Sequence, residues 1–315
     1  FTLAITTETT NAVIRYTTNG TPPSVTNGIV YAAPLLINRT TVLRAAAFRT
    51  GFLPSNVDTH TYLFLDDVIR QSSNGQAPPG WPSSWGGNTV DYGMDPDVVN
   101  NAKYSGTIKN DLKALPSFAI VMNLNDLFSS STGIYANPGQ EGAAWERPCS
   151  VELINPDGSD GFQIDAGLRI RGGFSRSTGN PKHAFRLFFR SEYGTPKLRY
   201  PLFGDAGTDT FDAIDLRTFQ NYSWSFQGDA NGVFLRDQFS RDVQLAMGHQ
   251  SERGNFYHLY INGQYWGLFN TCERPEASYG ETYFGGNKDD YDVIKVEAGP
   301  YTINATDCNM NAWTR

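Results

Sequence analysis

The first 65 residues alternate apolar and polar side chains in short runs, which is typical of β-strands. Three such runs are rich in β-branched and aromatic residues and span 12–18, 40–48 and 59–64. Asn19 and Gly20, followed by Thr-Pro-Pro, form strong turn chemistry directly after the first run. Short strands at this spacing predict a small immunoglobulin-like β-sandwich module over residues 1–65.

Residues 66–114 show little periodicity and are interpreted as a linker. Trp81 and Trp85 stand out in this stretch. The two indoles can form a sugar-stacking pair, or they can pin the linker onto a neighbouring domain. We favour the second, blander interpretation.

The pattern changes from Leu115 onward, where apolar runs of strand length recur. Seven strands are predicted, at 117–123, 149–154, 167–171, 184–189, 213–218, 255–261 and 265–271. Asn262 and Gly263 between the last two predict a two-residue hairpin turn. One helix is predicted over Val233–Met247, ended by Gly248. The mixture predicts an α+β domain over residues 115–315 with a mainly antiparallel sheet.

The phase of the predicted helix raises a question about one carboxylate. At about 100° per residue, Leu235 and Phe239 share one face, which we expect to pack on the sheet. Asp242 falls about 20° from Leu235, inside that apolar face. A buried carboxylate needs a cation or several donors, so Asp242 is expected to be buried, with Lys182 as the first choice of partner and Arg171 as the second. A purely structural salt bridge would satisfy it equally well.

Composition narrows the function class. The formal net charge is −7 and the isoelectric point about 5.1, so the basic footprint of a nucleic-acid-binding protein is missing. No stretch reaches the roughly 18 apolar residues that span a bilayer. Cys149, Cys272 and Cys308 form no CxxC pair, which argues against a zinc knuckle. Their pairing stays open between one disulfide with a free thiol and three buried thiols.

The stretch 169–189 is the first candidate for chemistry, because it reads as strand, glycine-bearing turn and strand. Gly172 and Gly173 allow the backbone to approach phosphate oxygens closely. Arg171 and Arg176 flank the turn, and Lys182 enters the second strand as a point charge. Glycine hairpins with nearby basic residues are common, so an ordinary solvated surface is the alternative.

Side-chain alternation along the second strand gives this stretch a testable geometry. Lys182 should share a face with Ala184 and Arg186, while Phe185 and Leu187 point to the core. Lys182 and the glycine turn are therefore expected to line one concave surface.

Two family resemblances extend this interpretation, and the first concerns the N-terminus. Residues 14–23, 43–47 and 61–62 make the first 65 residues similar to the small immunoglobulin-like module at the C-terminus of chitobiases. The resemblance implies a spacer or attachment role without chemistry.

The second resemblance covers residues from about 115 to 295 and is to the CotH spore-coat kinase family. It rests on seven stretches in this order: 133–135 (Gly-Ile-Tyr), 145–148 (Trp-Glu-Arg-Pro), 169–173, 181–187, 235–242, 260–268 and 273–275 (Glu-Arg-Pro). It implies an atypical kinase fold that uses ATP and Mg²⁺ to transfer the γ-phosphoryl group to secreted or spore-surface proteins.

The same resemblance implies a nucleotide-binding set. Its members are Arg171, Gly172, Gly173, Ser175 and Arg176 over the phosphates, Lys182 as the phosphate-binding lysine, and Asp242 as the carboxylate that pairs with it. The family's catalytic and metal-binding aspartates lie further downstream, and they are expected beyond Arg315. Asp289, Asp290 and Asp292 match an earlier family segment and receive no catalytic role.

Two hypotheses follow. The chain is a fragment of a secreted or cell-surface CotH-like kinase, cut at both ends from a longer precursor, inactive alone, with a protein substrate as partner. Alternatively, it is a non-catalytic extracellular structural or adhesion protein that uses a kinase-like scaffold and contacts neighbouring surface proteins.

Overall fold

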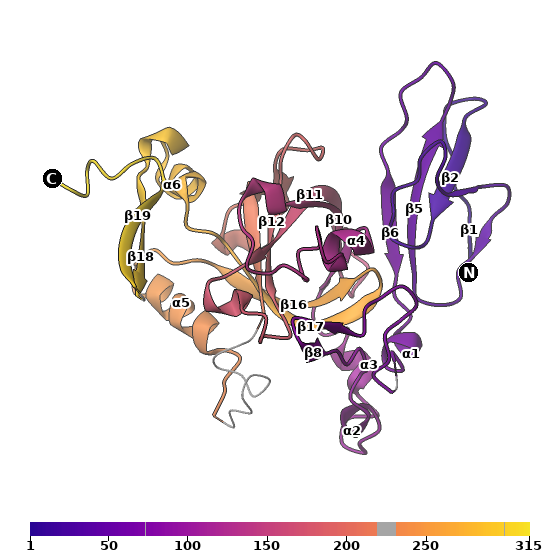
Figure 1. Cartoon of the computed structure of the whole chain (residues 1–315), viewed down its shortest axis with the longest axis horizontal. Helices are drawn as coiled ribbons and strands as arrows, with labels where there is room; N and C mark the ends of the chain where they lie inside the picture. Colours follow the sequence, from indigo (N-terminus) through magenta and orange to yellow (C-terminus); the bar gives the residue numbers. More distant parts are fainter. Residues whose placement is uncertain (73, 219–230, 299) are drawn as a thin grey trace.

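The protein has three parts that lie in a row along its longest axis (Figure 1). The computed structural model describes residues 1–72, 74–218, 231–298 and 300–315. An N-terminal module is followed by a central barrel, and a hairpin with its adjoining helices forms the C-terminal part. Strands dominate and helices are few, in keeping with the predicted α+β class.

The N-terminal module contains a four-stranded antiparallel sheet of order β3-β2-β5-β6 and a separate β1-β4 pair. Its strands are β1 (Thr2–Leu3), β2 (Val13–Thr17), β3 (Ile29–Val30), β4 (Leu35–Leu36), β5 (Thr41–Phe48) and β6 (Asp58–Tyr62). The three strands predicted here correspond to β2, β5 and β6. Strand β6 is an edge of its sheet, and it lies beside the barrel strand β10 (Arg147–Ile154).

The segment that follows consists of short elements packed on the barrel. These are α1 (Leu65–Val68), β7 (Ser84–Trp85), β8 (Asn88–Thr89), α2 (Pro96–Val99) and α3 (Ile108–Asp111). Trp85 is buried and donates its indole N–H to the carbonyl of Pro181 at 3.0 Å. Its ring stacks on Phe128, and Trp81 packs against the same cluster. The two tryptophans thus pin this segment onto the barrel, which confirms the favoured interpretation.

Seven strands close into a barrel of order β10-β11-β12-β15-β17-β16-β9. Besides β10 they are β9 (Ser117–Val121), β11 (Phe162–Arg171), β12 (Ala184–Phe188), β15 (Ala213–Arg217), β16 (Gly254–Ile261) and β17 (Gln264–Cys272). All neighbours are antiparallel except β9 and β16, which are parallel. Each corresponds to a predicted strand, and Asn262 (φ 46°) and Gly263 (φ 79°) form the predicted hairpin turn.

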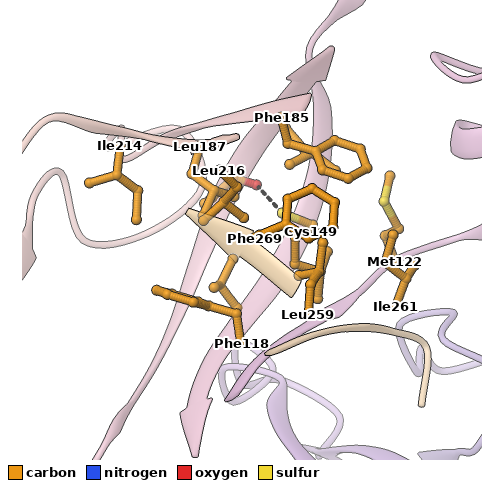
Figure 2. Packing of buried hydrophobic residues seen from close by; sticks show 14 of the residues in the cluster. Phe118, Met122, Cys149, Phe185, Leu187, Ile214, Leu216, Leu259, Ile261 and Phe269 are labelled. Atoms are coloured by element: carbon orange, nitrogen blue, oxygen red, sulfur yellow. Dashed lines mark hydrogen bonds between the residues drawn. The ribbon is translucent and has the colours of Figure 1, made fainter. Parts of the chain in front are cut away.

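The interior of the barrel is filled by every second side chain of its strands, and Figure 2 shows this packing. Phe185 of β12 and Phe269 of β17 stack at its centre with ring centroids 6.2 Å apart. Cys149 lies in the same core, where its thiol donates to the carbonyl of Ala166 at 3.4 Å. All three cysteines are free thiols: Cys149 and Cys272 are buried, and Cys308 is exposed.

The remaining elements surround the barrel or form the C-terminal part. They are α4 (Leu124–Phe128), β13 (Leu198–Arg199), β14 (Thr210–Phe211), α5 (Arg236–Ala246), α6 (Ala277–Phe284), β18 (Val293–Ala298) and β19 (Tyr301–Asp307). Short 3-10 turns cover Ala143–Trp145, Phe174–Arg176, Gly204–Ala206 and Lys288–Asp290. Strands β18 and β19 pair with each other as a separate hairpin. No helix in the described ranges has both the length and the apolar character needed to cross a bilayer.

Helix α5 packs on the barrel with the face opposite to the predicted one. Leu235 and Phe239 are 58% and 67% exposed, whereas Gln238 and Arg241 are buried. The Arg241 guanidinium donates to the side-chain oxygen of Asn270 at 2.5 Å. The barrel surface beneath α5 is polar, so the helix meets it through polar side chains. The prediction that Leu235 and Phe239 hold this helix on the sheet is therefore wrong.

The same rotation moves Asp242 to the surface. Its carboxylate is exposed and accepts a hydrogen bond from the side-chain amide of Gln238 at 2.6 Å. The prediction that Asp242 is buried and paired with Lys182 or Arg171 is wrong, because the apolar face in which it was placed is turned away from the barrel.

Candidate functional site

Basic side chains cross the outer surface of the barrel in register. Along β11 and β12 the inward residues fill the core, so Arg169, Arg171 and Arg186 point outward. Arg169 lies directly opposite Arg186, and Arg186 lies directly opposite Asp215 of β15. Like charges opposite each other across a sheet are destabilising. The row therefore needs counter-charges.

Asp215 is the first of these counter-charges. Its side chain is 3% exposed, and its oxygens accept from Arg171 Nε at 2.6 Å and Arg186 Nη2 at 2.9 Å. Burial opposes the charge, but the hydrogen bonds from Arg186 and the positive charge of Arg171 outweigh it and lower the pKa of Asp215. In turn, Asp215 raises the pKa of Arg171 against the effect of burial. The three side chains form one fixed, charged cluster.

Glu146 is the second counter-charge. Its buried carboxylate contacts Arg169 at 2.5 Å and Arg190 at 3.1 Å, and it accepts a hydrogen bond from the Tyr193 hydroxyl. Both guanidinium groups also lie over the ring of Phe188, at 4.3 and 4.8 Å from its centroid. This cluster holds Arg169 at the edge of the basic row.

The glycine turn closes the row at the end of β11. Gly172 has φ +118°, and a Cβ atom there would come within 1.7 Å of the Ser175 hydroxyl oxygen. Only glycine fits this position. Gly173 has no heavy atom within 4 Å of where a Cβ would stand, so its backbone faces open space. The turn thus offers accessible backbone beside the arginine row.

Arg176 fastens this turn to a neighbouring loop. Its Nε donates to the carbonyl of Gly172 at 2.5 Å, and its Nη1 donates to the carbonyls of Pro138 and Gln140 at 3.2 and 3.0 Å. Glu141 lies 3.3 Å from the same guanidinium. Arg176 therefore positions the turn, and these contacts occupy much of its donor capacity.

These pieces border a cleft of about 690 Å³ between the barrel and the β18–β19 hairpin. The opposite wall carries Val293, Ile294 and Thr306. Seven cationic side chains line the cleft: Arg169, Arg171, Arg176, Arg186, Arg217, Arg274 and Lys295. Three acidic ones line it: Glu141, Asp215 and Glu252. Among the lining residues cationic side chains therefore outnumber acidic ones. Four further carboxylates outside the lining, Glu146, Asp237, Glu276 and Glu297, pair with Arg169, Arg217, Arg274 and Lys295. The cationic groups that line the cleft favour anions over cations.

Lys182 lies outside the cleft. Its Nζ donates to the carbonyl of Trp266 at 2.6 Å, on a part of β17 beyond the residues that pair with β15. The residue as a whole is exposed, so the burial that lowers the pKa of Lys182 to about 8 applies to its enclosed ammonium end. The expected alternation holds for Ala184 and Arg186, which line the cleft. Lys182 itself does not line it with the glycine turn.

Of the predicted site residues, the structure brings five together along the cleft: Arg171, Gly172, Gly173, Ser175 and Arg176. Asp242 and Lys182 are not among its lining residues. Sequence reasoning missed Asp215 and Arg217 on β15, and Arg274 after β17. The available signal was the alternation in Ala213–Arg217, where a lone aspartate stands between apolar residues beside strands rich in arginine.

The cleft fits phosphate groups better than it fits a metal ion. Its volume is within the range of small-molecule sites, and its charge suits several phosphate oxygens. Each of the three acidic lining residues already has an arginine within 4 Å, namely Arg176, Arg171 or Arg241. Over the residues that the structure describes, no group of three His, Cys, Asp or Glu side chains is arranged to hold a metal ion.

Comparison with known families adds two matches. Residues 168–315 match the family described as CotH kinase protein, and residues 3–62 match the family described as Fn3 associated. All lining residues of the cleft except Glu141 and Gly142 lie inside the first match. No curated protein matches the chain.

Proposed function

We propose that this chain is the nucleotide-binding part of a secreted or cell-surface CotH-like protein kinase, because residues 168–315 match the CotH kinase protein family and residues 3–62 match the Fn3-associated family. The cleft binds the phosphates of ATP, and the γ-phosphoryl group goes to a hydroxyl group of a surface protein. The N-terminal module serves as a spacer or attachment. The observation that carries this proposal is the row of cationic side chains that lines the cleft beside an open glycine turn.

The cleft residues divide into two roles. Arg171 and Arg186 bind phosphate oxygens, and Asp215 fixes their guanidinium groups in place, which lowers the entropic cost of binding. The backbone at Gly172 and Gly173 approaches the same oxygens. Arg176 holds the turn in shape. Mg²⁺, when bound with ATP, neutralises charge on the phosphates.

We expect Arg186→Gln to weaken ATP binding by roughly 10- to 100-fold, because a charged hydrogen bond to phosphate is lost. Calorimetry with ATP, ADP and AMP measures this, and affinity should fall as phosphates are removed. Lys113→Gln makes the same charge change at an exposed position and should leave the affinity unchanged. If the Arg186→Gln variant binds ATP as tightly as the unaltered protein, the phosphates do not bind in this cleft.

The ATP affinity of a Lys182→Met variant tests whether the Lys182 ammonium group moves to the phosphates when ATP binds, as the family resemblance implies. A loss of affinity as large as that of Arg186→Gln would show that the ammonium group leaves the Trp266 carbonyl on binding. Unchanged affinity would restrict Lys182 to a structural role through its hydrogen bond to the Trp266 carbonyl.

We expect the 315-residue chain to bind ATP without phosphoryl transfer. The reaction needs carboxylates to hold the metal and to orient the acceptor hydroxyl. The three acidic residues of the cleft are held by Arg171, Arg176 and Arg241 instead. Release of ADP in the presence of Mg²⁺ and a protein acceptor is the measurement. Turnover that Arg186→Gln abolishes would contradict this expectation, whereas a chain that binds no ATP would favour the structural or adhesive alternative.

A further inference from the structure

The N-terminal module and the barrel meet through one carboxyl group. The edge strand β6 lies over the outer surface of β10, where Glu152 stands. The backbone N–H of Thr61 donates to Glu152 Oε1 at 3.1 Å, and the Thr61 hydroxyl donates to Oε2 at 2.5 Å. Glu152 therefore covers a backbone donor that the sheet edge would leave open.

This carboxyl group is buried at the contact without a counter-charge. Glu152 is 7% exposed, and none of the ion pairs between described residues includes it. Burial raises the pKa of Glu152 to about 7, and the two hydrogen bonds from Thr61 counter only part of this effect.

The ionisable groups around the contact do not neutralise Glu152. On β11, Asp165 has its pKa raised by burial, and its Oδ1 is buried without a hydrogen-bond partner. Arg44 of β5 is buried and donates to the carbonyl of Gly20 at 3.1 Å. Burial lowers the pKa of Arg44, and Asp165 counters that effect. The positive charge of Arg44 is thus directed at Asp165.

Of the other neighbours, His60 of β6 is exposed and alternates to the face away from Thr61, and the rest add negative charge or none. On β6, Asp58 raises the pKa of Asp165, and the pKa of Tyr62 is raised by burial and by Glu152. Strand β9 places Ala119 opposite Glu152, and Tyr260 of β16 lies opposite Ala119. The contact between the two parts therefore has the carboxyl groups of buried Glu152 and partly buried Asp165 against one buried cation, Arg44.

We propose that Glu152 makes the docking of the N-terminal module on the barrel depend on pH, with tighter docking when its carboxyl group is protonated. The neutral acid keeps both contacts, because its carbonyl oxygen accepts from the Thr61 N–H and its hydroxyl group can bond to the Thr61 hydroxyl. The ionised form loses its hydration on docking and gains no opposite charge.

The sign of the effect follows from linkage. The docked state binds the proton more tightly than an exposed glutamate, whose ordinary pKa is 4.5. Docking is therefore strongest below pH 4.5 as far as Glu152 is concerned, weakens as the pH rises to about 7, and is constant above that.

Hydrogen exchange at the Thr61 amide tests the proposal directly. After correction for intrinsic exchange rates, its protection should fall by roughly a hundredfold from pH 4.5 to pH 8. The amide of Leu187 in the barrel core serves as the reference for global unfolding. Glu152→Gln should give the same protection at both pH values, close to that of the unaltered protein in acid. Glu8→Gln, the same change at an exposed position, should keep the full pH dependence.

Three results would overturn the proposal. The first is equal Thr61 protection in the unaltered protein at pH 4.5 and pH 8. The second is a folded Glu152→Gln variant with Thr61 unprotected at both pH values, since docking would then need the charged carboxylate. The third result does not require that variant to fold. It is a carbon-13 titration of the Glu152 carboxyl group in the unaltered protein that gives a midpoint near pH 4.5 instead of near pH 7.

Discussion

Replacing Asp215 by asparagine is expected to lower the free energy of unfolding by about 3 kcal/mol. The change keeps the shape of the side chain and removes the charge that holds Arg171 and Arg186 together. Two guanidinium groups would then face each other on adjacent strands without compensation. Both arginines are partly exposed, at 29% and 20%, so water relieves part of the repulsion and the loss stays at the lower end of that for broken buried ion pairs.

Denaturant unfolding at pH 7 measures this loss, with Asp205→Asn as the matched change at an exposed aspartate. The pH dependence gives an independent check. The pKa of Asp215 is lower in the folded state than the ordinary value for aspartate, so its contribution is complete above about pH 4 and is lost as the pH falls further. The asparagine variant should lack this acid-sensitive part of stability. A loss below about 1 kcal/mol would mean that the pair behaves as a surface salt bridge.

The strands of this protein could be predicted because their side chains alternate locally. In β12, Phe185 and Leu187 enter the core and Ala184 and Arg186 line the cleft, as the two-residue period required. The pairing of these strands could not be predicted in the same way. The parallel contact between β9 and β16, which closes the barrel, joins residues more than a hundred positions apart, and no local pattern contains it.

Helix α5 shows where periodicity misleads. Its apolar stripe is real, but the pattern assumes that an apolar stripe faces the nearest sheet. The barrel presents Asn270 at that place, and Gln238 and Arg241 bind it instead. Leu235 and Phe239 are left outside, and Asp242 goes with them. A polar patch on the outside of a barrel cannot be recognised until its strands are paired.

The charge centre of the site was missed for a related reason. Asp215 lies in a predicted strand, but its role as a counter-charge depends on its position opposite Arg186 on the adjacent strand. Lys182 was assigned to the cleft by side-chain alternation and by the family resemblance. Its long side chain instead reaches along the barrel to the carbonyl of Trp266. Direction of the Cβ atom is set by the strand, whereas the position of a lysine ammonium group is set by whichever acceptor is within reach.

Phe185→Ala is expected to destabilise the protein by about 3–5 kcal/mol. Phe185 is completely buried at the centre of the barrel and stacks on Phe269, so its removal leaves a cavity that the closed ring of strands can fill only in part (Figure 2).

The neighbouring residue provides the control, because the strand turns it to the opposite surface. Arg186→Ala leaves Asp215 paired with Arg171 and should cost clearly less stability, while it removes a phosphate ligand. Phe185→Ala should keep its affinity for ATP under conditions in which it remains folded. Denaturant unfolding and calorimetry on the two variants therefore separate the two surfaces of one strand. Arg186→Ala could instead destabilise the protein as much as Phe185→Ala does. That result would show that the arginine cluster contributes as much to the stability of the barrel as its apolar interior does.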